Sequence, residues 1–262
     1  MSNQTLNSLE AGVCPIVIGT SRRAGVVKVR RVLFWVGLLA LLLATGCKQE
    51  TLFESNFEAT AVNQPPSPTQ KVGTATFAGG PGSVLVVAAP PDASPPTKWV
   101  RISRATTTGD TEPAPLTMFQ GNMTKAPGND KYTFSTLMYM PTGPNNVASI
   151  QFGTLNQPLG VFAGFFHLDF LKTNRIRIDD DESTIFGTFP RDKPFMVHVT
   201  LDVNNSSAKA HIVLVGAGTS GTADRNLRDP FSARQFGSVR IWMGFPFTGE
   251  FNAANVLVTR NQ

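Results

Sequence analysis

Hydrophobic and polar residues alternate with a period of two through most of the chain from Thr51 onward. In the segment 195–203, Phe, Val and Leu occupy the odd positions, whereas Met, His, Thr and Asp occupy the even ones. Because successive side chains of a strand point to opposite faces, this alternation predicts a half-buried strand. A similar segment at 208–215 follows the turn residues at 204–207, so the two segments predict a β-hairpin.

The same pattern recurs along the chain between clusters of Gly, Pro, Asn and Ser, and none of these segments has the period of an amphipathic helix. Further strands are predicted at 72–78, 83–89, 98–104, 132–140, 147–153, 161–170, 174–179, 184–189, 237–244 and 251–259. About a dozen short strands at this spacing are typical of an all-β chain folded as a two-sheet antiparallel β-sandwich.

Residues 1–47 do not follow this pattern and are predicted to be a targeting leader. Five basic residues between Arg22 and Arg31 precede an apolar run from Val32 to Ala44. That run is shorter than the roughly 18–20 apolar residues that span a bilayer, and it fits the apolar core of a secretory signal peptide. The chain therefore divides into a signal peptide at 1–46 and a β-sandwich domain at 47–262.

The end of the leader, Ala44-Thr45-Gly46-Cys47, resembles the lipobox of bacterial lipoproteins. The resemblance implies cleavage before Cys47, attachment of lipid to its sulfur, and a location in the bacterial cell envelope. The residue after Cys47 is Lys48 and not an aspartate. By the same resemblance to Gram-negative lipoproteins, this implies sorting to the outer membrane. The alternative is an ordinary cleaved signal peptide with an incidental cysteine. The other cysteine, Cys14, lies in the leader, so the mature chain cannot form a disulfide.

The composition agrees with a folded domain and argues against a nucleic-acid-binding protein. The chain is 41% hydrophobic and 16% charged, which is enough apolar content for a core. Its formal net charge of +5 comes largely from the leader, which holds five of the 23 basic residues and one of the 18 acidic ones. The mature chain is left with 18 basic and 17 acidic residues, so no nucleic-acid partner is predicted.

Several segments of the mature chain resemble the concanavalin A-like jelly rolls of lectins and glucanases. They are the opening segment 53–57, the strand 132–141, the hairpin 194–214 and the closing segments 237–245 and 251–259. The resemblance implies a two-sheet antiparallel sandwich, often with a concave face that binds carbohydrate. It also implies that a structural Ca²⁺ site is a candidate, since such sites are frequent in that family.

Two local motifs suggest ligands. Gly216-Ala-Gly-Thr-Ser-Gly221 has the G-x-G-x-x-G spacing of a dinucleotide site, but Pro230 interrupts any helix after it and no acidic residue lies about 20 positions further on. It is therefore predicted to be a loop between strands, with no nucleotide bound. Asp179-Asp180-Asp181-Glu182 is the candidate Ca²⁺ site, because adjacent carboxylates suit a hard cation. The alternative is a solvated acidic turn balanced by Arg175 and Arg177.

Carbohydrate binding requires aromatic rings and polar groups on the strand face opposite the core. Alternation predicts six such side chains, and we expect them to gather on one concave face: Trp242, Tyr139, His167, Asp169, His198 and Arg240. The alternative is that they form the solvated side of the strands, or that Trp242 is buried.

These observations predict a membrane-anchored lipoprotein with a non-catalytic sandwich that binds carbohydrate or another envelope component. Glycoside hydrolases on this fold place paired acids at alternating positions of one strand, and no such string exists here. The nearest approximation is His167-x-Asp169. The alternatives that remain are a polysaccharide-active enzyme, whose acidic pair would meet across strands, and a purely structural envelope lipoprotein.

Overall fold

The computed structural model describes residues 49–79, 82–93, 95–104, 117–125, 128–143, 145–155, 164–203, 208–227, 229–243 and 248–261. The predicted signal peptide, Cys47 and the predicted turn at 204–207 lie outside the described residues. Within the described part of the chain, no helix has both the length and the apolar character needed to cross a membrane.

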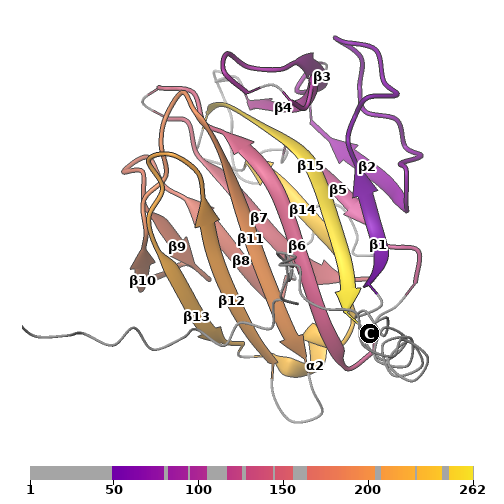
Figure 1. Cartoon of the computed structure of the whole chain (residues 1–262), viewed down its shortest axis with the longest axis vertical. Helices are drawn as coiled ribbons and strands as arrows, with labels where there is room; N and C mark the ends of the chain where they lie inside the picture. The colour runs from indigo at the N-terminus through magenta and orange to yellow at the C-terminus, as the bar shows by residue number, and fades with distance from the viewer. Residues whose placement is uncertain are drawn as a thin grey trace, which may run out of the picture. The chain divides into compact units, whose positions relative to one another are not determined.

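Fifteen strands and one short helix, α2 (Pro230–Ala233), make up the described elements, and the strands form two sheets (Figure 1). Sheet A holds β1 (Gln49–Ser55), β3 (Val84–Ala88), β4 (Lys98–Arg104), β6 (Asp130–Tyr139), β11 (Pro194–Val203), β12 (Ala208–Val215), β13 (Thr222–Asn226) and β15 (Gly249–Asn261). Sheet B holds β2 (Thr74–Ala78), β5 (Thr117–Asn122), β7 (Ala148–Thr154), β8 (Phe166–Phe170), β9 (Ile176–Ile178), β10 (Asp181–Phe186) and β14 (Phe236–Met243).

Neighbouring strands in both sheets are antiparallel. The order in sheet A is β13-β12-β11-β6-β15-β4-β3, with β1 also paired to β15, and the order in sheet B is β10-β9-β8-β7-β14-β5-β2. This arrangement confirms the predicted all-β, two-sheet antiparallel sandwich.

The predicted hairpin is present as β11 and β12, paired in register from Met196↔Val215 to Val203↔Ala208. The odd positions of β11 are buried and its even positions are more exposed, as the alternation predicts. The glycine-rich segment 216–221 connects β12 to the antiparallel β13, so it is a loop between sandwich strands.

Aromatic rings fill the space between the two sheets. Phe134 of sheet A meets Phe152 of sheet B with ring centroids 5.2 Å apart, and Phe152 also contacts Phe166 and Phe236 at 5.4 and 5.8 Å. These four side chains are at most 1% exposed. Because each ring brings a large apolar area out of water, this cluster is a major source of the stability of the sandwich.

Phe152→Ala is expected to lower the free energy of unfolding by about 3–5 kcal/mol, because it leaves a cavity among three other rings. Equilibrium unfolding in urea measures the loss. Val215→Ala, at a side chain that is 53% exposed, serves as the control and should change stability by less than about 0.5 kcal/mol. Similar losses for the two variants would contradict the assignment of the core.

Candidate ligand-binding face of sheet B

Two rows of mostly polar side chains cross the outer face of sheet B. In one row, Gln120 of β5, Arg240 of β14, Gln151 of β7 and His167 of β8 pair in register. They lie on this face because Val239 and Ile241, the neighbours of Arg240 on β14, point into the core. The adjacent row lies two residues further along the strands, on the same face, and consists of Trp242, Ser149, Asp169 and Arg177. We call these eight residues the sheet B face.

Three side chains of the first row, those of Gln120, Arg240 and Gln151, are buried. Arg240 is 3% exposed, and its guanidinium donates to Gln120 Oε1 from Nε at 3.0 Å and to Gln151 Oε1 from Nη1 at 3.1 Å. Burial lowers the pKa of Arg240. Gly164 packs so closely on this row that a Cβ atom there would overlap the side chain of Gln151. The glutamines therefore hold the guanidinium in one orientation within a tightly packed layer.

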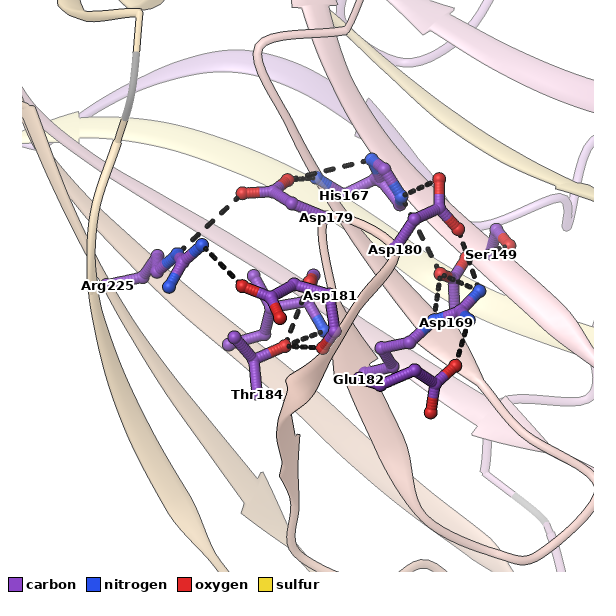
Figure 2. A network of polar contacts seen from close by, with 11 residues as sticks. Ser149, His167, Asp169, Asp179, Asp180, Asp181, Glu182, Thr184 and Arg225 are labelled. Carbon is purple, nitrogen blue, oxygen red and sulfur yellow. Dashed lines mark hydrogen bonds and ion pairs between the residues drawn. The ribbon is translucent and has the colours of Figure 1, made fainter.

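Asp169 is the centre of the second row (Figure 2). Ser149 donates from Oγ to Asp169 Oδ1 at 2.6 Å, and Arg177 donates from Nη2 to Asp169 Oδ2 at 3.1 Å. His167 Nε2 lies 3.6 Å from the same carboxylate and 3.1 Å from Asp180 Oδ2. Burial raises the pKa of Asp169, although the hydrogen bond from Ser149 and the nearby His167 act in the opposite direction.

The acidic segment 179–182 consists of the turn between β9 and β10, formed by Asp179 and Asp180, and the first two residues of β10. Asp179 and Asp180 both have positive φ, 51° and 56°, as the two central residues of a type I′ turn do. Aspartate tolerates this backbone region better than most residues, which explains why two of them stand here.

Figure 2 shows that the four carboxylates of this segment do not converge on one point. Asp180 and Glu182 accept from Arg177 at 2.7 and 2.6 Å. Asp179 accepts from the backbone N–H of His167 at 2.9 Å, and Asp181 accepts from Ser183. Ca²⁺ takes roughly six to eight oxygen ligands around one point, and this arrangement does not fit such a site.

The arrangement instead agrees with the alternative prediction of an acidic turn balanced by arginine. Arg177 takes that role as expected, whereas the second arginine is Arg225 of β13, 3.5 Å from Asp181 and 3.9 Å from Asp179. His167, Asp169 and Asp180 could each offer one metal-ligating atom, all within 4.8 Å of one another. However, the Arg177 guanidinium contacts both of these carboxylates and already supplies the positive charge.

Four of the six predicted ligand-binding residues, Trp242, Arg240, His167 and Asp169, lie together on the sheet B face. His198 and Tyr139 do not, so the expectation of one shared face is wrong for them. Both belong to sheet A, since Tyr139 lies on β6 and His198 on β11. Alternation identifies the outer side of a strand but not the sheet to which the strand belongs.

Tyr139 and His198 occupy different surroundings within sheet A. Tyr139 is 7% exposed and packs in a small apolar cluster with Trp99, Ala93 and Ala254. Burial raises the pKa of its hydroxyl. His198 pairs with Ser135 on β6, and burial together with the nearby His211 lowers the pKa of its imidazole.

Sequence reasoning missed Gln120, Ser149, Gln151 and Arg177 as members of the face. Each is brought there by cross-strand register, which the pattern along a single strand does not contain. Gln120 also lies on a strand, β5, that the alternation did not predict. Two signals were available in the sequence. The alternation in 147–153 places Ser149 and Gln151 on the same side of one strand, and the alternation in 174–179 places Arg177 opposite Ile176 and Ile178.

Ser149, His167 and Asp169 are the residue types of a hydrolytic triad, but their contacts are in a different order. In such a triad the histidine accepts the proton of the serine, and the aspartate orients the histidine. Here Ser149 donates to Asp169 instead. His167 is therefore not placed to activate Ser149 as a nucleophile.

No protein-family model matches the sequence, and no match was found among curated proteins. Lectin I from Ulex europaeus, in complex with the methyl glycoside of α-L-fucose, matches 81% of this chain and 98% of its own with a TM-score of 0.51 and 11% identity. Arcelin-5, a lectin-like defense protein from Phaseolus vulgaris, matches 82% of this chain and 98% of its own with a TM-score of 0.49 and 9% identity.

An endo-1,3-β-glucanase from Streptomyces sioyaensis matches 82% of this chain and 97% of its own with a TM-score of 0.47 and 12% identity. At these identities the likeness concerns the fold. The match to the Ulex lectin supports the predicted concanavalin A-like jelly roll for this chain.

The raised pKa of Asp169 predicts a pH dependence of stability. Native Asp169 keeps its proton to a higher pH than the unfolded chain, whose carboxyl titrates near 3.8. The native state therefore binds more protons in this interval, and the free energy of unfolding falls as pH rises through it. Asp169→Asn lacks this titration. Urea unfolding at a series of pH values should show wild type losing stability relative to Asp169→Asn from pH about 3.8 upward. A constant or increasing difference would contradict the assignment.

Proposed function

We propose that this chain is a lipid-anchored protein of the bacterial envelope whose sandwich binds a carbohydrate through the sheet B face, without catalysis. The observation that carries this proposal is the partly exposed Trp242 beside a fixed array of hydrogen-bonding side chains. The fold supports it, since the matching Ulex lectin is a structure in complex with a methyl glycoside of fucose.

The chemistry of the sheet B face suits a sugar. An indole ring offers an apolar surface for the C–H face of a pyranose, and neighbouring polar groups offer donors and acceptors to its hydroxyls. Ser149 stands directly across from Trp242 on β7, and Asp169 follows on β8. Asp169, His167 and Arg177 hold one another in place, so little side-chain entropy remains to be lost when a ligand binds.

The anchor is part of the same proposal. The lipobox-like segment ending at Cys47 follows a basic flank and an apolar run, in the order that a lipoprotein leader requires. Lipid on Cys47 would make the membrane a partner of the protein, and several acyl chains on one residue anchor far more firmly than one. Lys48 supports placement in the outer membrane.

Trp242→Ala is expected to weaken binding to the preferred glycan by about ten-fold, since a stacking contact contributes up to roughly 1.5 kcal/mol. A glycan array identifies the ligand, and titration calorimetry measures the affinity.

His167→Ala should weaken binding as well, because it removes a polar group of the same face. The matched control is His198→Ala on sheet A, which should bind as wild type does. Unchanged affinity for Trp242→Ala, or equal effects of the two histidine variants, would contradict the proposed face. An array without any bound glycan would favour a purely structural lipoprotein.

A second candidate function, hydrolysis of a polysaccharide, is favoured by one specific observation. Asp169 and Asp180 each have an oxygen within 4.8 Å of the other's, close to the roughly 5–5.5 Å between the carboxyl groups of retaining glycosidases. Asp169, with its pKa raised by burial, would be the general acid. Asp169 lies on β8 and Asp180 in the turn between β9 and β10, so the pair comes from two separate segments of the chain.

The release of reducing ends from a panel of polysaccharides separates hydrolysis from binding alone. If the second candidate holds, Asp169→Asn and Asp180→Asn should each reduce the rate by about 10²- to 10⁴-fold. Asp202→Asn, at a carboxylate on the outer side of sheet A, should retain full activity. Wild-type protein that binds a glycan and releases no reducing ends would rule hydrolysis out.

A further inference from the structure

Strand β1 begins only two residues after the proposed lipid attachment point. Gln49 is the first residue of β1 and pairs with Asn261 of β15, and its side-chain Nε2 donates to Thr259 Oγ1 at 2.7 Å. Two peptide links extend about 7 Å at most. An anchor at Cys47 would therefore hold the start of β1 within about 7 Å of the lipidated residue.

Strand register shows which end of the sandwich this is. Six residues form the last cross-strand row that runs from β1 through to β13 at this end of sheet A, and we call it the Gln49 row: Gln49, Asn261, Lys131, Asp202, Lys209 and Asn226. In Figure 1 the row lies at the end of sheet A near the C-terminus and α2. Sheet B reaches the same end through Phe236, whose ring contacts that of Tyr132 at 5.5 Å.

The charges at this end are largely paired. Lys131 lies 3.3 Å from Asp202, Arg260 donates to Glu50 at 2.6 Å, and Lys125 also pairs with Glu50. The large apolar side chains found exposed in the described part of the chain are Val62, Phe77, Met196 and Val215, and none of them belongs to the Gln49 row. Such a surface can rest among hydrated headgroups, whereas burying its charges among acyl chains would be costly.

We propose that the sandwich stands on the membrane by this end, with the Gln49 row against the lipid headgroups. The short tether sets the orientation, and no part of the domain inserts into the bilayer. This inference rests on the proposed lipidation of Cys47. It also places the sheet B face away from the membrane, since Trp242 lies six residues along β14 from Phe236, a strand length of about 20 Å.

Site-specific labelling tests the orientation. In the lipidated mature chain Cys47 is occupied, so a single introduced cysteine is the only free thiol. Lys131→Cys places an environment-insensitive fluorophore in the Gln49 row, and Lys193→Cys places it just before β11, at the opposite end. Both lysines are exposed, and the two positions are about nine strand residues, or roughly 30 Å, apart.

The labelled proteins are reconstituted into vesicles of phosphatidylethanolamine and phosphatidylglycerol that contain a lipid with a nitroxide on its headgroup. We expect the nitroxide to quench the fluorophore at position 131 several-fold more strongly than the one at position 193. Equal quenching, or stronger quenching at position 193, would overturn the proposed orientation.

A second pair of variants separates the tether from the anchor. A flexible Gly/Ser spacer of about 20 residues after Lys48 has a reach near 25 Å, and it should abolish the difference between the two positions. A difference that persists with the spacer would overturn the role of the tether. Mass spectrometry and vesicle flotation, compared with Cys47→Ser, report on the anchor alone. A wild-type chain without lipid would overturn both the anchor and this inference.

Discussion

The packing of aromatic side chains between two sheets is the constraint from which the rest of the molecule follows. The described residues contain no cysteine, so no disulfide among them adds to this packing. Phe134, Phe152 and Phe166 face inward. Because successive side chains of a strand point to opposite faces, the residues next to them in sequence face outward. The same constraint acts on the backbone: a Cβ atom at Gly121 of β5 would lie 2.6 Å from the ring of Phe53, so glycine lets that ring lie against sheet B.

On the outer surface of sheet B, hydrogen bonds and ion pairs fix the orientation of polar side chains that lie directly above this core. Arg240 is held by two neutral amides, whereas Asp169 is held by a hydroxyl, a guanidinium and an imidazole. These contacts satisfy groups that would otherwise be costly to bury. Burial still raises the pKa of Asp169, and both the binding and the hydrolytic proposals involve this carboxyl group.

The fold could be predicted from the sequence because alternation is a local signal. Strands β11 and β12 each have one buried face, and the turn residues between them are strong indicators of a hairpin. Strand β5 was missed because nearly every residue in it is buried, so its sequence Thr-Met-Phe-Gln-Gly-Asn has no alternation to detect. The membership of the sheet B face was only partly predictable. It depends on which strands pair, and the pairing of β6 with β11 is decided by contacts far apart in sequence.

Arg225 has a consequence for how the molecule behaves among its own copies. It lies on β13, the outermost strand of sheet A, and its side chain reaches across to Asp179 and Asp181 in the hairpin at the margin of sheet B. An exposed edge strand can pair with a strand of another chain and so extend the sheet. An inward-pointing charged residue on the edge strand opposes this pairing. This protection matters most at high protein concentration, because two copies that meet side by side could otherwise pair their edge strands.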